Sequence, residues 1–168
     1  LLSLKKRTMG RPNKREGVLT SIHGNVLEQL ARFKFLTPKQ FMRLNVGTTQ
    51  ITYLRKNLQH LRDRKKPFIG CHSFNFPDPK KGRVENIYFL KPRGKQMCVQ
   101  ELFVEENSIR MPIGTSMAYK DYFHRVATVW FQIALWQWAK RNEWNLSLFD
   151  TYFDKLGNNR VLGNLRAK

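Results

Sequence analysis

The segment Leu36-Thr37-Pro38-Lys39-Gln40 constrains the fold more tightly than any other stretch of the chain. Thr37 can cap a helix, Pro38 suits the first helical position, and Gln40 can reach back from the third position to the cap. The helix that begins here must be short, because Asn45-Val46-Gly47 follows and favours a turn. The sequence therefore predicts a short capped helix that ends in a glycine-containing turn.

Apolar residues at helical spacing lie on both sides of this short helix. Upstream, Thr20 or Ser21 can cap a helix with a periodic apolar face. Downstream, Thr48 can cap a third helix with one apolar stripe. The two apolar sets are Ile22, Val26, Leu27, Leu30 and Ala31 upstream, and Ile51, Leu54, Leu58 and Leu61 downstream. Helix, short helix, turn and amphipathic helix is the order of a helix-turn-helix.

The periodicity changes from helical to strand-like after Pro67. Residues 68–74 and 84–90 are rich in aromatic and β-branched side chains, and the segment between them is rich in turn-forming residues. A hairpin directly after the third helix predicts the wing of a winged helix. Its tip carries Lys80, Lys81 and Arg83.

The formal net charge of +19 is concentrated in the first part of the chain. Residues 1–95 carry 22 Lys and Arg against 5 Asp and Glu, whereas residues 96–168 carry 9 against 7. Nucleic acid is the commonest partner of such a surface, and an acidic membrane is the second choice. We therefore expect the partner site within residues 1–95.

The polar face of the third helix is the main candidate site. A helix with such a face can enter the major groove, where it meets base edges and phosphates. We expect base contacts from Thr52, Tyr53, Lys56 and Gln59, with Thr49 and His60 on the same face. We expect phosphate contacts from Arg55, Arg62, Arg64, Lys80, Lys81 and Arg83. The alternative is a solvated helix face beside an ordinary hairpin tip.

Residues 1–16 form a basic segment without apolar periodicity, which we expect to be a flexible arm. Gly10-Arg11-Pro12 resembles the core of an AT-hook or of a minor-groove arm, where Arg11 would enter the groove. A disordered tail that makes non-specific phosphate contacts is an equal alternative.

The C-terminal part is near neutral in charge. We expect a helix from Pro92 to about residue 104, a linker over 105–116, and a long helix over about 116–141 that Asn142 ends. A strand over 144–149 follows, so residues 117–168 are the start of a second domain. Trp130, Trp136 and Trp138 are expected in the core or at an interface.

Enzymatic and metal-binding signatures are sparse. Cys71 and Cys98 match no metal-binding spacing, and the four histidines are scattered. Asp150 and Asp154 after the late strand are weak candidates for catalysis or for holding Mg²⁺. DNA binding itself needs no cofactor. The low cysteine content and the lack of a signal peptide favour a cytoplasmic protein, and Val129–Ala139 is too short to cross a bilayer.

Three segments resemble plasmid replication-relaxation proteins. Leu36 to Phe41 resembles their "LTxxQ" helix start, and Tyr88 to Gly94 resembles their "Y-x-L-T-P-x-G" exit from the wing, with Lys91 in place of Thr. His124, followed by Asn142-Glu143-Trp144, resembles their "H…x-G-W" segment, with Asn142 in place of Gly. That group is similar to mobilisation relaxases of the MOBC type.

The resemblance implies an α+β chain, with a winged helix at residues 17–104 and a partial nuclease-like α/β domain after it. It implies duplex DNA binding at the origin of transfer of a plasmid or mobile element, with other relaxosome or coupling proteins as partners. The parent protein would nick DNA with Mg²⁺ or Mn²⁺, on catalytic strands that we expect beyond Lys168. The chain lacks an initiator Met, so we expect a fragment of a longer protein. The alternatives are a winged-helix transcription regulator or replication initiator with a C-terminal dimerisation element, and a metal-dependent nuclease complete within this chain.

Overall fold

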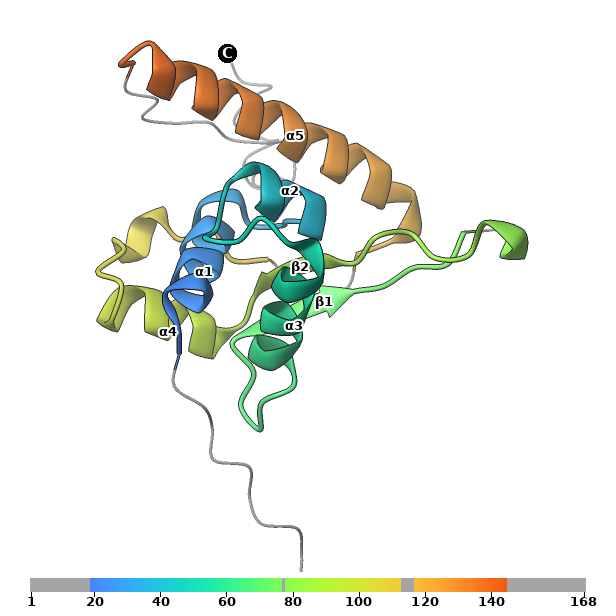
Figure 1. Cartoon of the computed structure of the whole chain (residues 1–168), viewed down its shortest axis with the longest axis horizontal. Coiled ribbons are helices and arrows are strands. Elements are labelled where there is room, and N and C mark those ends of the chain that lie inside the picture. The colour runs from blue at the N-terminus through green and yellow to red at the C-terminus, as the bar shows by residue number, and fades with distance from the viewer. Residues whose placement is uncertain (1–18, 77, 113–116, 145–168) are drawn as a thin grey trace, which may run out of the picture.

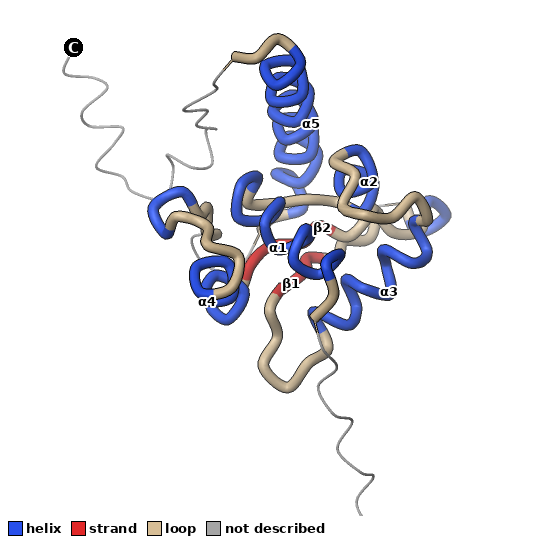
Figure 2. The backbone as a smooth tube through the Cα atoms, turned by 60° about the vertical axis from the view of Figure 1, so that its left-hand side comes forward, coloured by secondary structure: helices blue, strands red, loops and turns tan. Residues whose placement is uncertain are grey.

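The computed structural model describes residues 19–76, 78–112 and 117–144. It is an α+β structure in which helices surround a small antiparallel sheet (Figures 1 and 2). In chain order the helices and strands are α1 (Ser21–Phe33), α2 (Pro38–Arg43), α3 (Ile51–Arg62), β1 (Ile69–His72), β2 (Ile87–Leu90), α4 (Pro92–Gln100) and α5 (Tyr119–Arg141). Short 3-10 turns, η1 (Pro79–Lys81) and η2 (Glu106–Ser108), lie before β2 and after α4.

The first two helices begin where the capping residues predict. Thr20 caps α1, with His23 at the third position instead of the usual Glu or Gln. Thr37 caps α2: its backbone N–H donates to Gln40 Oε1 at 2.9 Å, and the Gln40 N–H donates to Thr37 Oγ1 at 3.4 Å. Both boxes satisfy backbone donors that a helix start leaves without partners.

The predicted cap of α3 is wrong by two residues. The helix begins at Ile51 with Gln50 as its cap, and the Gln50 side chain makes no capping hydrogen bond. Thr48 instead accepts a hydrogen bond from the Gln50 N–H at 3.1 Å, which closes a small turn before the helix. Asn45 and Gly47, both at positive φ, form the expected turn after α2.

The two strands are shorter than predicted but pair as a hairpin. Ile69 lies opposite Leu90 and His72 opposite Ile87. Further out, hydrogen bonds from Val84 N to Phe74 O and from Phe76 N to Gly82 O keep the two arms together. Residues 69–90 are called the hairpin below, and Figure 1 shows it reaching well away from the body of the protein.

A third segment adds to this sheet. Leu36, between α1 and α2, exchanges both backbone hydrogen bonds with Tyr88, at 3.1 and 2.8 Å. This antiparallel bridge ties the helices to β2 and fixes where the hairpin leaves the body.

Helix α4 packs closely on the sheet through Gly94. A Cβ at Gly94 would lie 2.2 Å from the Phe68 carbonyl oxygen, so the backbone approaches more closely than any side chain allows. The helix ends at Gln100, earlier than the predicted residue 104, and Phe103 follows at φ +53°.

The predicted linker over 105–116 would separate the C-terminal part from the rest of the chain. In the structure, described residues of this segment pack against the body instead. Ile109 is buried within the predicted linker, and the Arg110 N–H donates to the Ala31 carbonyl at 2.8 Å. Val129 and Ile133 of α5 belong to the same hydrophobic cluster as α1, α2 and the sheet. Residues 19–144 therefore share one core across the ranges described.

Helix α5 matches the predicted long helix, with Asn142 at its C-terminal cap. Trp144 lies outside any strand, and the rest of the predicted strand at 144–149 falls outside the described residues. Among the described helices, none combines the length and the apolar character that crossing a membrane requires.

Candidate nucleic-acid interface

Helix α3 presents a polar, basic face because its leucines point into the core. Leu54, Leu58 and Leu61 are fully buried. The remaining turns of the helix leave an outward face that includes Thr52, Tyr53, Arg55, Lys56 and Gln59, all of which are exposed. Thr49 is also exposed but lies in the turn before the helix. The predicted base-contacting residues thus share one accessible surface.

The hairpin tip carries the predicted basic residues on a tight turn. Lys80 and Lys81 lie in η1 and are exposed. Asp78 organises this turn, because its Oδ1 accepts from Lys80 N at 3.0 Å and its carbonyl accepts from Lys81 N at 3.1 Å. The tip therefore presents the Lys80 and Lys81 side chains on a hydrogen-bonded turn.

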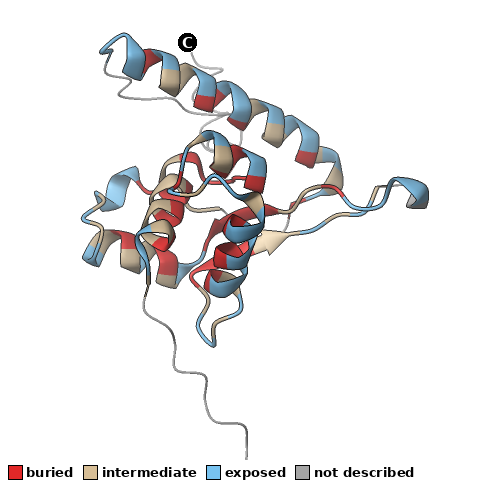
Figure 3. Ribbon diagram, viewed as in Figure 1, coloured by how far each residue is buried: buried red, intermediate tan, exposed pale blue. Residues whose placement is uncertain are grey.

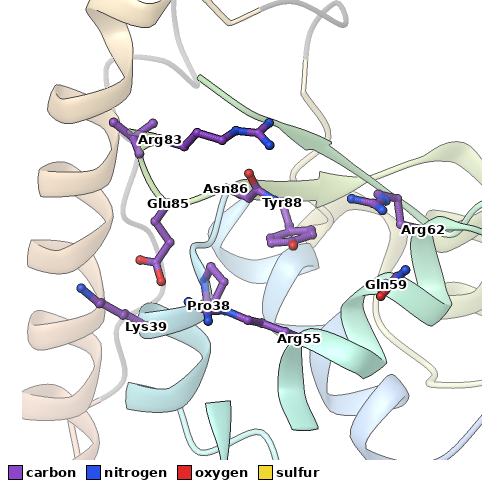
Figure 4. Close-up of a pocket in the computed structure, with 10 residues that line it drawn as sticks. Pro38, Lys39, Arg55, Gln59, Arg62, Arg83, Glu85, Asn86 and Tyr88 are labelled. Carbon is purple, nitrogen blue, oxygen red and sulfur yellow. The ribbon is translucent and has the colours of Figure 1, made fainter. Parts of the chain in front are cut away.

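A groove of about 610 Å³ lies between α3, the start of α2 and the hairpin (Figure 4). We call it the cationic groove. Its lining contains four basic side chains and one acidic one. It is lined by Pro38, Lys39, Arg55, Gln59, Arg62, Arg83, Val84, Glu85, Asn86 and Tyr88. Three predicted phosphate-contacting arginines, Arg55, Arg62 and Arg83, therefore meet in one place.

Arg62 is held more firmly than an ordinary surface arginine. Its Nε donates to Asp63 Oδ1 at 2.6 Å, and its Nη1 lies 3.6 Å from Cys71 Sγ. The hydrogen bond to Asp63, together with that to Cys71, raises the pKa of Arg62 above its usual value. The same hydrogen bond lowers the pKa of the Asp63 carboxyl. Arg62 thus keeps its charge, and Asp63 neutralises part of the field at the end of α3.

Sequence reasoning missed four residues that bring polar groups to the groove, namely Lys39, Glu85, Asn86 and Tyr88. Tyr88 is 5% exposed, and burial raises the pKa of its hydroxyl, so the phenol stays protonated and can donate a hydrogen bond. Glu85 opposes the cations, and its buried Oε1 has no hydrogen-bond partner among the described residues. Strand alternation through residues 84–90 was the signal that could have placed Asn86 and Tyr88 beside α3.

Comparisons of this chain with protein-family models, curated proteins and solved structures gave no match. The assignment of function therefore depends on the geometry of the described residues.

Arg64 lies outside the cationic groove. Its Nη2 is 3.3 Å from His60 Nε2, on the opposite flank of α3, and its guanidinium lies 5.3 Å from the Phe68 ring. His60 Nδ1 is in turn 3.3 Å from His23 Nε2. The structure therefore brings His23 and His60 together, although they lie far apart in the sequence, and it places Arg64 beside them.

Several predicted site residues cannot be placed. Arg11, Asp150 and Asp154 lie outside the described residues. Within the described part of the chain, no three His, Cys, Asp or Glu residues are grouped so that they could hold a metal ion. No metal-dependent step is assigned to these residues.

The tryptophan-rich helix α5 has both a buried and an exposed side. Trp136 packs edge-on against Phe33 at 6.2 Å between ring centroids, and Arg32 lies 4.7 Å from the Trp136 ring. Trp130 and Trp138 are 38% and 43% exposed. Trp136 thus packs on the core, as one half of the prediction had it, whereas Trp130 and Trp138 are left exposed, where only the other half, an interface, could hold.

Proposed function

We propose that this chain binds duplex DNA as a winged helix, with α3 in the major groove and the hairpin as the wing. Two structural features support the proposal. The order of α1, α2, α3 and a hairpin is that of a winged helix-turn-helix. The isolated bridge between Leu36 and Tyr88 ties the segment before α2 to β2, which would hold such a wing in place.

The observation that carries the proposal is the cationic groove. Lys39, Arg55, Arg62 and Arg83 come from α2, α3 and the hairpin and converge on one open groove. Phosphate contacts supply most of the sequence-independent affinity for DNA and fix the orientation of the protein on the duplex. A DNA backbone that follows this groove would carry α3 into the adjacent major groove.

The roles within the site follow from position. Thr52, Lys56 and Gln59 project from the exposed side of α3 and would reach base edges. Arg55 and Arg83 line the groove and would contact phosphates, as would Lys80 and Lys81 at the hairpin tip. Glu85 would then face the DNA as the one acidic group of the groove.

The resemblance to plasmid replication-relaxation proteins suggests which DNA is bound. We propose the origin of transfer of a plasmid or mobile element, where the chain would serve as the recognition part of a mobilisation protein. Nicking of that DNA is not assigned to the described residues.

A second candidate function is favoured by the aromatic side chains that α5 exposes, which suit a subunit interface. A winged-helix regulator or replication initiator binds as a dimer to two half-sites about one helical turn apart. A footprint separates the candidates: one asymmetric site beside a nick indicates mobilisation, and two symmetric half-sites indicate the dimeric protein.

The groove can be tested by fluorescence anisotropy with a short labelled duplex. Between about 50 and 200 mM salt the affinity should fall about 10³–10⁵-fold, as expected for several phosphate contacts. Arg55→Ala and Arg83→Ala should each weaken binding to all sequences alike and reduce the salt slope by about 1.

Lys120→Ala is the matched control, because Lys120 is exposed on α5 and does not line the groove. It should leave the salt slope unchanged. A wild-type affinity that does not depend on salt, or an equal loss in the Lys120 variant, would contradict the assignment of the groove.

A further inference from the structure

Helix α5 carries a buried apolar side and, separately, an exposed apolar stripe. Tyr122, Val129 and Ile133 are buried against the body, whereas the other side is exposed along the length of the helix (Figure 3). At about 100° per residue the exposed apolar residues fall on one stripe. This α5 stripe consists of Phe123 (49% exposed), Ala127, Trp130 (38%), Phe131 (62%), Ala134 and Trp138 (43%). Single exposed apolar residues are ordinary, but a contiguous stripe of this kind marks an interaction surface.

The α5 stripe has the same spacing and the same order of residue types from its N-terminal and its C-terminal end. Its members follow one another at steps of four, three, one, three and four residues, in the order aromatic, alanine, aromatic, aromatic, alanine, aromatic. A two-fold interface requires this self-complementarity, because residue i of one copy contacts residue j of the other and the reverse. An antiparallel pair of α5 helices centred between Trp130 and Phe131 would set Ala127 opposite Ala134.

We propose that the α5 stripe is the surface through which two copies of this chain pair, with their α5 helices antiparallel. In this register Phe123 lies opposite Trp138, and Trp130 lies opposite Phe131. The facing alanines leave room for the two helices to approach closely, so that the rings on either side interleave.

The size of the stripe fits a reversible dimer. With about 150–250 Å² of surface per aromatic side chain, the four partly exposed rings offer about 400 Å² per copy. Two copies would bury about 800 Å² from the rings alone, and flanking residues bring the total near the 1,000 Å² or so at which specific interfaces begin. We therefore expect pairing at micromolar concentrations rather than an obligate dimer.

Charges at the ends of the stripe predict how salt affects pairing. Lys120 and Arg141 are exposed at opposite ends of α5, and the antiparallel register brings Lys120 near the partner's Arg141. Salt screens this repulsion and that of the overall +19 charge. Pairing should therefore strengthen with salt, whereas DNA binding should weaken.

Pairing through α5 is compatible with DNA binding but does not depend on it. Figure 1 shows α2 lying between α5 and α3, and no residue of the stripe lines the cationic groove. The test below uses no DNA and can fail while the DNA proposal holds.

The test is sedimentation equilibrium of the full chain over a range of concentrations. The wild type should move from 20.0 kDa toward twice that mass. Two double variants, Ala127→Glu with Ala134→Glu and Ala127→Lys with Ala134→Lys, each place like charges opposite one another. Each should raise the dimer dissociation constant by about 100-fold or more. An equimolar mixture of the two variants sets Glu opposite Lys at both positions, so it should recover the dimer.

The matched control is Gln96→Glu with Gln100→Glu, which places two exposed carboxylates four residues apart on α4. It should dimerise like the wild type. A wild type that stays monomeric at every concentration and salt, for instance because another part of the chain covers α5, overturns the proposal. A double glutamate variant that still dimerises would show that the α5 stripe is not the interface. A mixture that stays monomeric would show that the antiparallel register is wrong.

Discussion

His23 joins two helices through one ring. It is 3% exposed, its Nδ1 accepts from the Thr20 N–H at 2.9 Å, and its Nε2 lies 3.3 Å from His60 Nδ1. Burial, followed by the nearby His60 and Arg64, lowers the pKa of His23 from 6.5 to about 4. The imidazole is therefore neutral in the folded protein, as its role as an acceptor in the capping box requires.

This lowered pKa predicts acid sensitivity. The unfolded chain binds a proton at His23 near pH 6.5, whereas the folded chain does so only near pH 4. Stability is thus full above pH 6.5 and falls as the pH drops toward 4, by about 2–3 kcal/mol for this group. Urea unfolding at several pH values measures the effect.

His23→Gln is the control for this effect, because glutamine can complete the capping box without titrating. The variant should lose less stability than the wild type between pH 6.5 and 4. Burial also lowers the pKa of His72, but that residue is present in both proteins, so the difference isolates His23. The same acid loss in both proteins would show that His23 does not titrate as described.

At the scale of elements, Gln40 connects α2 to the C-terminal part. Its Oε1 accepts from Thr37 N, and its Nε2 donates to the Val126 carbonyl of α5 at 3.0 Å. The side chain is fully buried. One glutamine therefore both starts a helix and fastens another helix onto it.

Gln40→Ala should destabilise the protein by about 2–4 kcal/mol, since it leaves the buried Thr37 N–H without its acceptor, removes the hydrogen bond to α5 and empties a fully buried side-chain position. Thermal or urea unfolding measures the change. Thr48→Ala removes a hydrogen bond of similar type from an exposed turn and should change stability by less than about 1 kcal/mol. Equal losses in the two variants would contradict the role of Gln40.

Local sequence predicted the elements where the signal and its partner are close in the chain. Thr37 and Gln40 are three residues apart, and their capping box formed as expected. Thr48 carries an equally good capping side chain, but that side chain closes a turn instead. Within the predicted linker at 105–116, Arg110 is tied to Ala31, a contact that no local pattern can reveal.

On the scale of the whole molecule, α5 supports the hairpin. The Tyr122 hydroxyl donates to the Glu85 carbonyl at 2.7 Å, and burial raises its pKa to about 12. The Tyr122 ring also lies edge-on to Phe74 at 5.8 Å, and Phe123 lies 6.2 Å from Phe76. One helix thus fixes the outer wall of the cationic groove from behind.

Tyr122→Phe should loosen the hairpin without removing a side chain from the groove. Losing one hydrogen bond of about 1 kcal/mol should speed amide exchange at Phe76 and Val84 about fivefold. Hydrogen–deuterium exchange measures this directly. Tyr53→Phe, on the exposed face of α3, is the matched control and should leave hairpin exchange unchanged, and unaltered exchange in the Tyr122 variant would show that α5 does not support the hairpin.

The sequence predicted those parts of the candidate site that lie within a single helix or hairpin, and missed those that depend on how several elements pack. Periodicity and charge placed Arg55 on α3 and Arg83 near the hairpin tip. They could not show that Lys39, at the start of α2, would join them, because that depends on how three elements pack. Sequence alone grouped Arg64 with Arg55 and Arg62, but Arg64 lies beyond the end of α3, beside His60 and outside the groove lining.

Gly94 sits where the backbone of α4 touches the carbonyl of Phe68, with space for a hydrogen atom and nothing larger. Natural variation at this position should consequently be almost nil, whatever else changes among descendants of this sequence. Any chain that packs a helix this closely on a strand needs a glycine at the contact. Two proteins can therefore both place a glycine shortly after a strand because of this geometry, without a common ancestor.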